Sequence, residues 1–362
     1  MKVLVTGAKG FIGKNLIAYL SKEEDVEIIE FDIEDKLEDL DIKNIDFIFH
    51  LAGINRPKDA SEFNINADLT QQLVELLKEN DCKTPLVISS STQAELDNDY
   101  GNSKKRAEEY LLENYPPSII YRFHNVFGKW CRPNYNSVVA TFCNNIANDL
   151  DIQINDPKSE IELVYIDDIC ETLIKELYGK IQHKEDINYI EPRKKINLKD
   201  LSELIYSFKD CMNSIYTPKT GDPFVKKLFA TFVSYLPPEK MIQASEKHED
   251  ERGAFSELVK TLDSGQFSVS YSKPGVIRGN HYHHTKMERF IVIKGQAKIK
   301  FRHIITNEQY EYNVDDSKLQ IVTIPVGYTH SIENIGPGEM ILFLWCNEIF
   351  DEDHPDTYYE EV

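Results

Sequence analysis

The first residues of the chain place the strongest limit on how it can fold. The run KVLVTGAKGFIGKNLIAYL joins a short apolar strand, a glycine-rich turn and a helical pattern, and Gly7, Gly10 and Gly13 follow the spacing G-x-x-G-x-x-G. Glycines at these positions allow a tight turn and let backbone amides approach a pyrophosphate at the positive end of a helix. The run predicts a Rossmann-type, doubly wound α/β sheet with a dinucleotide site that includes Phe11 and Ile12.

Two further strand ends are expected to line the same site. The segment VEIIEFD ends at Asp32, whose carboxylate can hydrogen-bond an adenosine ribose and so favours NAD. The alternative is that Asp32 is one more acid in an acidic loop. The segment DFIFHLAG is a third buried strand that leads into Leu51, Ala52 and Gly53, and the two small residues would let a cofactor pass closely.

A serine-ended strand followed by a Tyr-x-x-x-Lys pair indicates chemistry at this sheet edge. The strand LVIS brings its serines to the carboxyl edge, where open parallel sheets bind ligands. Tyr100 and Lys104 lie on one face of the following helix, and we expect the lysine ammonium to lower the pKa of the phenol. Ser91 can then share a substrate carbonyl or alcohol with Tyr100. Ser90 takes this place if the strand register differs by one residue.

Residues 1–240 resemble the extended short-chain dehydrogenase/reductase family. The segments that match are TGAKGFIG, HLAG, SSS, YGNSK, RFHNVFG, VYIDD and Asn66 in NINADLT. The resemblance implies hydride transfer between a nicotinamide and a carbonyl carbon, often on a nucleotide-activated sugar. It makes Tyr100 the proton donor, Lys104 its partner and a ribose ligand, and Ser91 the residue that orients the carbonyl.

The substrate side of this first domain departs from the family in places. The loop TQAELDND is short for the family, and His124 stands where proline is frequent. The segment GKWCRPNYNSVVATF holds cations and amides among aromatic side chains, as a nucleotide-diphosphate site needs. Asn125, Arg132 and Asn134 are the candidate substrate ligands. The alternative is an ordinary polar loop ahead of a helix.

The texture of the sequence changes in its last third. A chain of 362 residues exceeds what one hydrophobic core usually holds, so two domains are expected. The Pro-Pro pair in YLPPEK stops a helix, and short segments with period-two alternation follow it. We expect a Rossmann domain at 1–243 and an all-β barrel at 244–362.

Histidines and a glutamate at regular spacing predict a metal site in the second domain. The stretch PGVIRGNHYHHTKMERFIVIKG contains His281 and His283, which point to one face of a strand, and Glu288 on the next strand. His284 has the opposite parity and is expected to point away. His330, from PVGYTHSIEN, can supply a fourth ligand. Three imidazoles and a carboxylate suit a divalent zinc, nickel, iron or manganese ion.

These two blocks resemble the two-part signature of the cupin superfamily. The first part matches at every position, and the second lacks its leading glycine because residue 319 is leucine. The segments DERGAFSEL and GVIRGNHYH resemble the sugar-nucleotide epimerase branch of that superfamily. This resemblance implies that Arg252 and Arg278 contact substrate phosphate and that the histidine after RG, here His281, abstracts a proton. The two roles of His281 compete, and the complete ligand set favours the metal.

Over its whole length the chain resembles a family of capsular polysaccharide synthesis enzymes. The resemblance rests on the domain order and on the runs FGKWCRPNYNSVVATFC, HHTKMERF, IPVGYTHSIEN and DTYYEEV. It implies that the second domain epimerises C3 of a UDP-activated 4-keto-6-deoxy-N-acetylhexosamine with zinc. The first domain then reduces the C4 ketone with NADPH to a UDP-N-acetyl-L-talosamine-type 6-deoxysugar, a precursor of N-acetyl-L-fucosamine. The resemblance also implies a homodimer.

Chemistry fixes the order of the two reactions, but local residues leave other points open. A 4-keto group acidifies the C3–H bond and reduction removes that acidity, so epimerisation must come first. Asp32 would repel the 2′-phosphate of NADPH and Lys36 is the only cation expected nearby, so the local residues favour NADH. The epimerisation base can be a histidine or one of Lys273, Lys294 and Tyr282.

Composition excludes some classes of function. A net charge of −20 disfavours nucleic-acid binding. The sequence has no apolar run of about 18 residues and moves from Met1 directly into a strand, so we expect no membrane insertion and a cytoplasmic location. The six cysteines are scattered, which favours reduced thiols. Two alternatives stay open: a non-catalytic, cofactor-bound sugar sensor, and an iron oxygenase fused to a reductase.

Overall fold

The structure, a computed structural model, describes residues 1–362 except for the side chain of Ala60. Its contacts divide the chain into two units, each of which is described by itself. The first unit comprises 1–205 and 230–236, and the second comprises 206–229 and 237–362. The predicted domain boundary between residues 243 and 244 stays a prediction.

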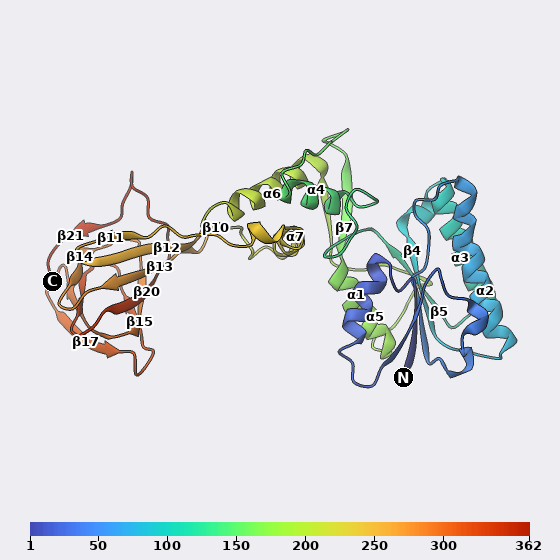
Figure 1. Cartoon of the computed structure of the whole chain (residues 1–362), viewed down its shortest axis with the longest axis horizontal. Helices are drawn as coiled ribbons and strands as arrows, with labels where there is room; N and C mark the ends of the chain where they lie inside the picture. The colour runs from blue at the N-terminus through green and yellow to red at the C-terminus, as the bar shows by residue number, and fades with distance from the viewer. The chain divides into compact units, whose positions relative to one another are not determined.

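A six-stranded parallel sheet forms the centre of the first unit (Figure 1). Its strand order is β2-β1-β3-β4-β5-β8. The strands are β1 (Lys2–Thr6), β2 (Glu27–Phe31), β3 (Phe47–His50), β4 (Leu86–Ser91), β5 (Ser118–Phe123) and β8 (Ile187–Asn188). The direction of the chain through the sheet reverses beside β1, and ligands of such sheets bind at the carboxyl ends of the strands at this point.

Helices cover both faces of this sheet (Figure 1). One pair consists of α1 (Phe11–Leu20) and α5 (Ile166–Leu177), and the other of α2 (Ile65–Glu79) and α3 (Asp99–Asn114). Val3 and Leu16 belong to the buried cluster on the α1 side, whereas Leu4 and Leu73 belong to the cluster on the α2 side. Burial on both faces explains why the strands read as nearly continuous apolar runs.

Smaller elements complete the first unit and lead into the second. A three-stranded sheet is formed by β6 (Asn125–Phe127), β7 (Glu160–Tyr165) and β9 (Arg193–Asn197). The other helices are α4 (Val138–Ala147), α6 (Leu198–Met212) and α7 (Pro223–Val233), and the 3-10 turns are η1 (Leu37–Asp39), η2 (Ile42–Asn44), η3 (Ala60–Asn64), η4 (Thr92–Glu95) and η5 (Pro238–Lys240). Helices α6 and α7 each contain residues of both units.

The second unit contains two β-sheets. One has the order β10-β12-β13-β20-β15-β18, with β11 paired to β12, and the other has the order β17-β16-β19-β14-β21. The strands of the first sheet are β10 (Tyr216–Thr217), β11 (His248–Asp250), β12 (Gly253–Thr261), β13 (Gly265–Ser272), β15 (Glu288–Lys294), β18 (Ile321–Ile324) and β20 (Met340–Cys346). Those of the second are β14 (Ile277–Tyr282), β16 (Gln296–His303), β17 (Gln309–Asp315), β19 (Tyr328–Asn334) and β21 (Tyr358–Tyr359).

The strands of the second unit alternate between buried and exposed positions. Ala297, Ile299 and Phe301 of β16 are buried and belong to one apolar cluster with Phe290 and Ile332. The pairs between these strands are antiparallel, apart from the short parallel pair β10–β12. The predicted fold class, a parallel α/β sheet followed by an all-β region, is confirmed.

No helix among the described residues combines the length and the apolar character that a membrane span requires. The six cysteines are free thiols.

Candidate active sites

The glycine-rich turn after β1 is built against the ends of two neighbouring strands. Gly7 has a φ of +70°, and its N–H donates to the carbonyl of Phe31 at 2.8 Å. A Cβ at Gly7 would lie 2.8 Å from the backbone of Ala52, so only glycine fits this close approach. The turn therefore brings the ends of β1, β2 and β3 together.

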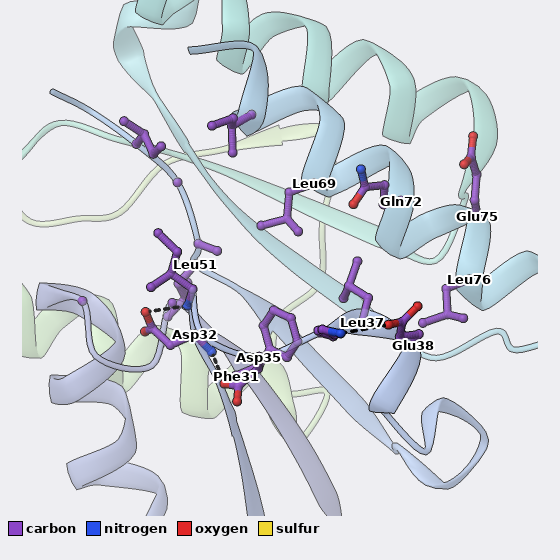
Figure 2. A pocket seen from close by; sticks show the side chains of 18 of the residues that line it. Phe31, Asp32, Asp35, Leu37, Glu38, Leu51, Leu69, Gln72, Glu75 and Leu76 are labelled. Carbon is purple, nitrogen blue, oxygen red and sulfur yellow. Dashed lines mark hydrogen bonds and ion pairs between the residues drawn. The ribbon is translucent and has the colours of Figure 1, made fainter. Parts of the chain in front are cut away.

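A cavity of about 830 Å³ opens at these strand ends (Figure 2). Of the predicted cofactor residues, it is lined by Gly7, Gly10, Asp32, Leu51, Ala52 and Gly53. Phe11 and Ile12 instead pack against the core under α1, and Gly13 is buried in that helix. The sequence analysis missed the α2 wall, which Figure 2 shows with Leu69, Gln72 and Leu76. The spacing of these three residues, which places them on one face of a helix, was the sequence signal by which this wall could have been predicted.

The acid at the end of β2 is held by the glycine-rich turn. The carboxylate of Asp32 accepts the N–H of Lys9 at 2.7 Å, and the Lys9 ammonium lies 2.9 Å from Glu34. The Glu34 carboxylate, helped by Asp32 and Asp35, raises the pKa of Lys9. The expectation that Lys36 is the only nearby cation is therefore wrong, because the turn folds Lys9 back onto this loop.

The predicted reductase residues meet at the carboxyl end of β4. Tyr100 and Lys104 lie in the first turns of α3, whose N-terminus is capped by Asn98 through the N–H of Gly101 at 2.8 Å. Ser91, the last residue of β4, lies near enough to Tyr100 to affect the pKa of its phenol, and the Ser91 hydroxyl accepts the N–H of Gln93 at 3.2 Å. The buried Ser90 hydroxyl instead donates to Glu108. The geometry thus brings Ser91 to the phenol and turns Ser90 away from it.

Burial dominates the ionisation of the two helix residues. It raises the pKa of Tyr100, and the nearby Ser91 hydroxyl opposes this only in part. It also lowers the pKa of Lys104 to about 8, and the Lys104 ammonium donates to the carbonyl of Ser89 at 3.0 Å. The expected lowering of the phenol pKa by Lys104 is wrong for this structure, since the ammonium is directed at the strand end.

Asn66 connects the elements around the predicted reductase residues. Its side chain bonds to both backbone groups of Ile54, accepting at 2.7 Å and donating at 2.9 Å, and donates to the Ser103 hydroxyl at 3.0 Å. A Cβ at Gly53 would lie 3.0 Å from both Asn66 Oδ1 and Lys104 Nζ. The sequence motif contained Asn66, but its bonds join three separate segments and no local pattern predicts them.

The predicted nucleotide-diphosphate residues do not form one group. Arg132 lies over the ring of Tyr135 with its guanidinium carbon 4.9 Å from the ring centroid, and Arg56 lies over the same ring at 5.9 Å. The side chain of Asn134 bonds to Asn145 at 3.2 Å, and that of Asn125 donates to the Glu162 carbonyl at 3.2 Å. The structure thus adds Arg56, which the sequence analysis missed, and gives both asparagines partners within the protein.

In the second unit, the four predicted metal ligands converge. One ligand atom from each of His281, His283, Glu288 and His330 lies within 4.8 Å of the others. They come from β14, the loop after it, the start of β15, and β19. His284 is exposed and its ring packs against Tyr282 and Tyr358 outside this cluster.

The donor set of this cluster fits a divalent cation. Among the described residues, His283 Nε2, Glu288 Oε2 and His330 Nε2 are buried without a hydrogen-bond partner. His330 Nε2 approaches Glu288 Oε2 to 3.0 Å, but the two atoms are not in hydrogen-bond geometry. Burying such atoms unpaired costs about 1–3 kcal/mol each, which a shared metal ion would offset.

The ionisation of the cluster also suits a metal. Burial, followed by the nearby His330, lowers the pKa of His281 to about 4, so its imidazole is neutral at pH 7 as a ligand must be. Burial alone would raise the pKa of Glu288, but His283 and His330 outweigh it and hold this pKa well below its usual value. The cluster thus offers a neutral imidazole at His281 and a carboxylate at Glu288.

A second cavity, of about 460 Å³, lies against this cluster. Arg252 and Arg278 line it, and the nearest atoms of their guanidiniums lie 2.6 and 3.8 Å from the carboxylate of Asp250. Lys286, which the sequence analysis did not single out, also lines it and is only 8% exposed. The candidate bases Lys273, Lys294 and Tyr282 are not among its lining residues.

Comparisons with known proteins also divide the chain into an N-terminal and a C-terminal part. The model of the "NAD dependent epimerase/dehydratase family" matches residues 3–188, and that of the "Polysaccharide biosynthesis C-terminal domain" matches residues 248–358. The UDP-2-acetamido-2,6-beta-L-arabino-hexul-4-ose reductase of Pseudomonas aeruginosa is 46% identical over an alignment of 365 positions, which covers 99% of this chain and 98% of that protein.

Solved structures are similar over the same range. The crystal structure of the capsular polysaccharide assembling protein CapF from Staphylococcus aureus has a TM-score of 0.91 at 43% identity and covers 100% of both chains. A UDP-glucuronic acid 4-epimerase from Bacillus cereus, solved with UDP-glucuronic acid and NAD, has a TM-score of 0.50 at 21% identity. That match covers 58% of this chain and 83% of the epimerase, and shows a similarity of fold alone.

Proposed function

This chain belongs to the NAD dependent epimerase/dehydratase family and carries a polysaccharide biosynthesis C-terminal domain, and from this premise we propose that it is a bifunctional UDP-sugar enzyme of capsule precursor synthesis. Its cupin-type domain epimerises C3 of a UDP-2-acetamido-2,6-dideoxy-4-hexulose. Its reductase domain then reduces the C4 ketone to a UDP-N-acetyl-L-talosamine-type sugar. The observation that carries the proposal is the presence of two groups of residues in one chain, Ser91, Tyr100 and Lys104 in the first unit and four converging potential metal ligands in the second.

The reductase step rests on Ser91, Tyr100 and Lys104. The nicotinamide, when bound in the cavity behind Gly7 and Asp32, supplies the hydride for C4. Ser91 and Tyr100 hold the ketone oxygen, and the Tyr100 hydroxyl gives it a proton, so that a carbonyl becomes a secondary alcohol. Lys104, whose pKa of about 8 keeps much of it charged at pH 7, would hold the ribose of the nicotinamide beside the end of β4.

The epimerase step rests on the four ligands and the two arginines of the second cavity. A divalent metal, for which we propose zinc, supplies electrophilic stabilisation of the C4 oxygen when bound to His281, His283, Glu288 and His330. Arg252 and Arg278 would bind the diphosphate in place of Asp250. A basic group of this cavity would take the C3 proton, and a proton delivered from solvent or from a second group to the opposite face would restore the C–H bond with inverted configuration.

We also propose NADPH as the reductant, with Lys9 as the cation that receives its 2′-phosphate. Lys9 stands in the glycine-rich turn beside Asp32, and its ammonium is exposed and paired only at the surface with Glu34. A charge-assisted contact is worth about 1.5–3 kcal/mol, so Lys9→Gln is expected to raise KM for NADPH at least tenfold and to leave KM for NADH nearly unchanged. Initial rates with both cofactors test this, and a wild-type preference for NADH would reject it.

The whole proposal is tested by supplying the UDP-4-keto-6-deoxy-N-acetylhexosamine together with NADPH. Oxidation of one NADPH per sugar and an inverted C3 in the NMR spectrum of the product are expected. A product reduced at C4 with unchanged C3 would leave only a reductase. No consumption of NADPH would favour the sugar sensor, and metal analysis that finds iron, together with oxygen uptake, would favour the oxygenase. The homodimer stays a prediction, and light scattering of the purified protein can test it.

A further inference from the structure

The C-terminal strap, residues 356–360, lies across the strand that carries the first metal ligands. Its β21 pairs with β14 so that Tyr359 stands opposite His281 and Tyr358 opposite Tyr282. The N–H of Glu360 donates to the carbonyl of Asn280 at 3.0 Å, and the Thr329 hydroxyl, next to His330, donates to the Glu360 carbonyl. The end of the chain is thus bonded to residues adjacent to two ligands.

Asp356 makes the most direct of these contacts through its main chain. Its carbonyl oxygen accepts a hydrogen bond from His283 Nδ1. A carbonyl oxygen can only accept, so Nδ1 must carry the proton of the neutral ring and Nε2 must carry the lone pair. His283 Nε2 is the atom that faces the cluster, 3.6 Å from Glu288 Oε2 and without a hydrogen-bond partner. This one bond therefore selects the tautomer that a ligand at Nε2 requires.

The carboxylate of Asp356 organises the loop between the second and third ligands. It accepts the N–H groups of His284 at 2.9 Å, Thr285 at 2.7 Å and Lys286 at 2.8 Å, and the Thr285 hydroxyl at 3.0 Å. Consecutive N–H groups that converge on one anion form a rigid turn. Because this turn connects His283 to Glu288, the carboxylate sets the distance and direction between two ligands.

The strap also forms part of the wall of the second cavity. Thr357 lines that cavity, and its hydroxyl accepts a hydrogen bond from the buried Lys286 ammonium at 2.9 Å. The Arg302 guanidinium fixes the far end of the strap through Glu360 at 2.7 Å. The strap is thus bonded at both ends.

We propose that the C-terminal strap is a positioning element of the metal centre, in which Asp356 fixes the tautomer of His283 and the loop that leads to Glu288. The proposal rests on the metal centre of the proposed function and adds a residue that lies 73 positions along the sequence from His283, the ligand it contacts. Asp356 is not one of the four proposed ligands. It is expected to affect the affinity for the metal ion through His283, to which it is hydrogen-bonded. Groups that support metal ligands in this way typically change metal affinity roughly 10–100-fold.

The test compares zinc dissociation constants of the full-length wild type with those of three variants, by competition with a chromophoric chelator. Asp356→Ala removes the anion from the turn and is expected to weaken zinc binding roughly 10–100-fold. Asp356→Asn keeps an oxygen that can accept the Thr285 and Lys286 N–H groups and is expected to lie in between. Asp353→Ala removes an exposed acid just before the strap and is the matched control, expected to bind as the wild type.

Two further readouts separate positioning from folding. The visible spectrum of the cobalt-loaded protein reports the ligand geometry and is expected to change in Asp356→Ala. The unfolding midpoint of the metal-free variants reports the fold, and Asp356→Asn carries the test if Asp356→Ala does not fold. Equal zinc affinity in the wild type and both Asp356 variants, or an equal loss in Asp353→Ala, would overturn the strap proposal alone. A wild type that binds no divalent ion would overturn the metal centre itself.

Discussion

Lys104 is a residue at which the demands of the reaction and of stability oppose each other. It is buried, and burial lowers its pKa to about 8 from an unfolded value of 10.5. The unfolded chain therefore binds more protons between these values, and the wild type gains stability as the pH rises through this window. Lys104→Met removes this cost, which amounts to about 3 kcal/mol of unfolding free energy at pH 7. The substitution also removes the hydrogen bond to Ser89, which offsets about 1 kcal/mol of that gain.

We predict that Lys104→Met unfolds at a higher urea concentration than the wild type at pH 7 and that the advantage shrinks at pH 10. Urea unfolding curves at the two pH values measure this. A variant that is less stable than the wild type by the same amount at both pH values would show that burial of the Lys104 ammonium does not destabilise the fold.

Tyr100 offers a second test at the scale of one residue. Tyr100→Phe removes only the hydroxyl that we propose as the proton donor, so reduction is expected to slow about 10²–10⁴-fold with little change in cofactor affinity. Tyr110→Phe, on the same helix but away from Ser91, is the matched control. Steady-state rates and cofactor titrations measure both effects. Full activity in Tyr100→Phe would show that a group other than Tyr100 donates the proton.

Residues that follow a local spacing could be predicted from the sequence. The glycines, the Tyr-x-x-x-Lys pair and the histidines repeat at distances that a turn, a helix or a strand imposes. The residues that were missed act across the fold. Lys9 and Arg56 meet their partners only when separate loops close, and the pKa of Tyr100 depends on burial, which no spacing records.

At the scale of elements, a β-bulge in β14 sets the position of His281, the first of the proposed metal ligands. Gly279 pairs with Ser331 and His281 with His330, so Asn280 is the extra residue. Gly279 has a φ of +95°, and a Cβ there would lie 2.7 Å from the carbonyl of His330. The bulge therefore aligns two of the histidines across the strand pair.

Gly279→Ala is predicted to cost about 1–3 kcal/mol of stability and to weaken zinc binding, because it strains the backbone next to two ligands. Asn280→Gly, at a φ of 58°, is the control and is expected to change stability by less than about 1 kcal/mol. Thermal unfolding of metal-free protein and zinc titration measure the two effects. Zinc affinity unchanged in Gly279→Ala would separate the bulge from the metal centre.

The kinds of elements were predictable, whereas some of their partners were not. Apolar runs and alternating segments indicated the parallel sheet and the β-strands, since these periods follow from burial on two faces or on one. The α2 wall of the first cavity and the pairing of β21 with β14 depend on which elements meet in space. A two-residue strand such as β21 carries no periodicity of its own.

At the scale of the whole molecule, the residues proposed for the two reactions belong to different units. The proposed reductase residues lie in the first unit and the four converging ligands in the second. Removal of the metal by a chelator is therefore predicted to abolish C3 inversion and to leave nicotinamide binding intact. Fluorescence titration of the cofactor before and after chelation tests this. A large loss of cofactor affinity would contradict the separation of the sites.

The central claim is that the second unit inverts C3 before the first unit reduces C4. The most direct measurement incubates the protein with a UDP-4-keto-6-deoxy-N-acetylhexosamine in deuterium oxide, without a nicotinamide, and follows C3 by NMR. Deuterium is expected at C3 with the wild type and with Tyr100→Phe, and not with His330→Ala. No deuterium at C3 with the wild type would contradict the account.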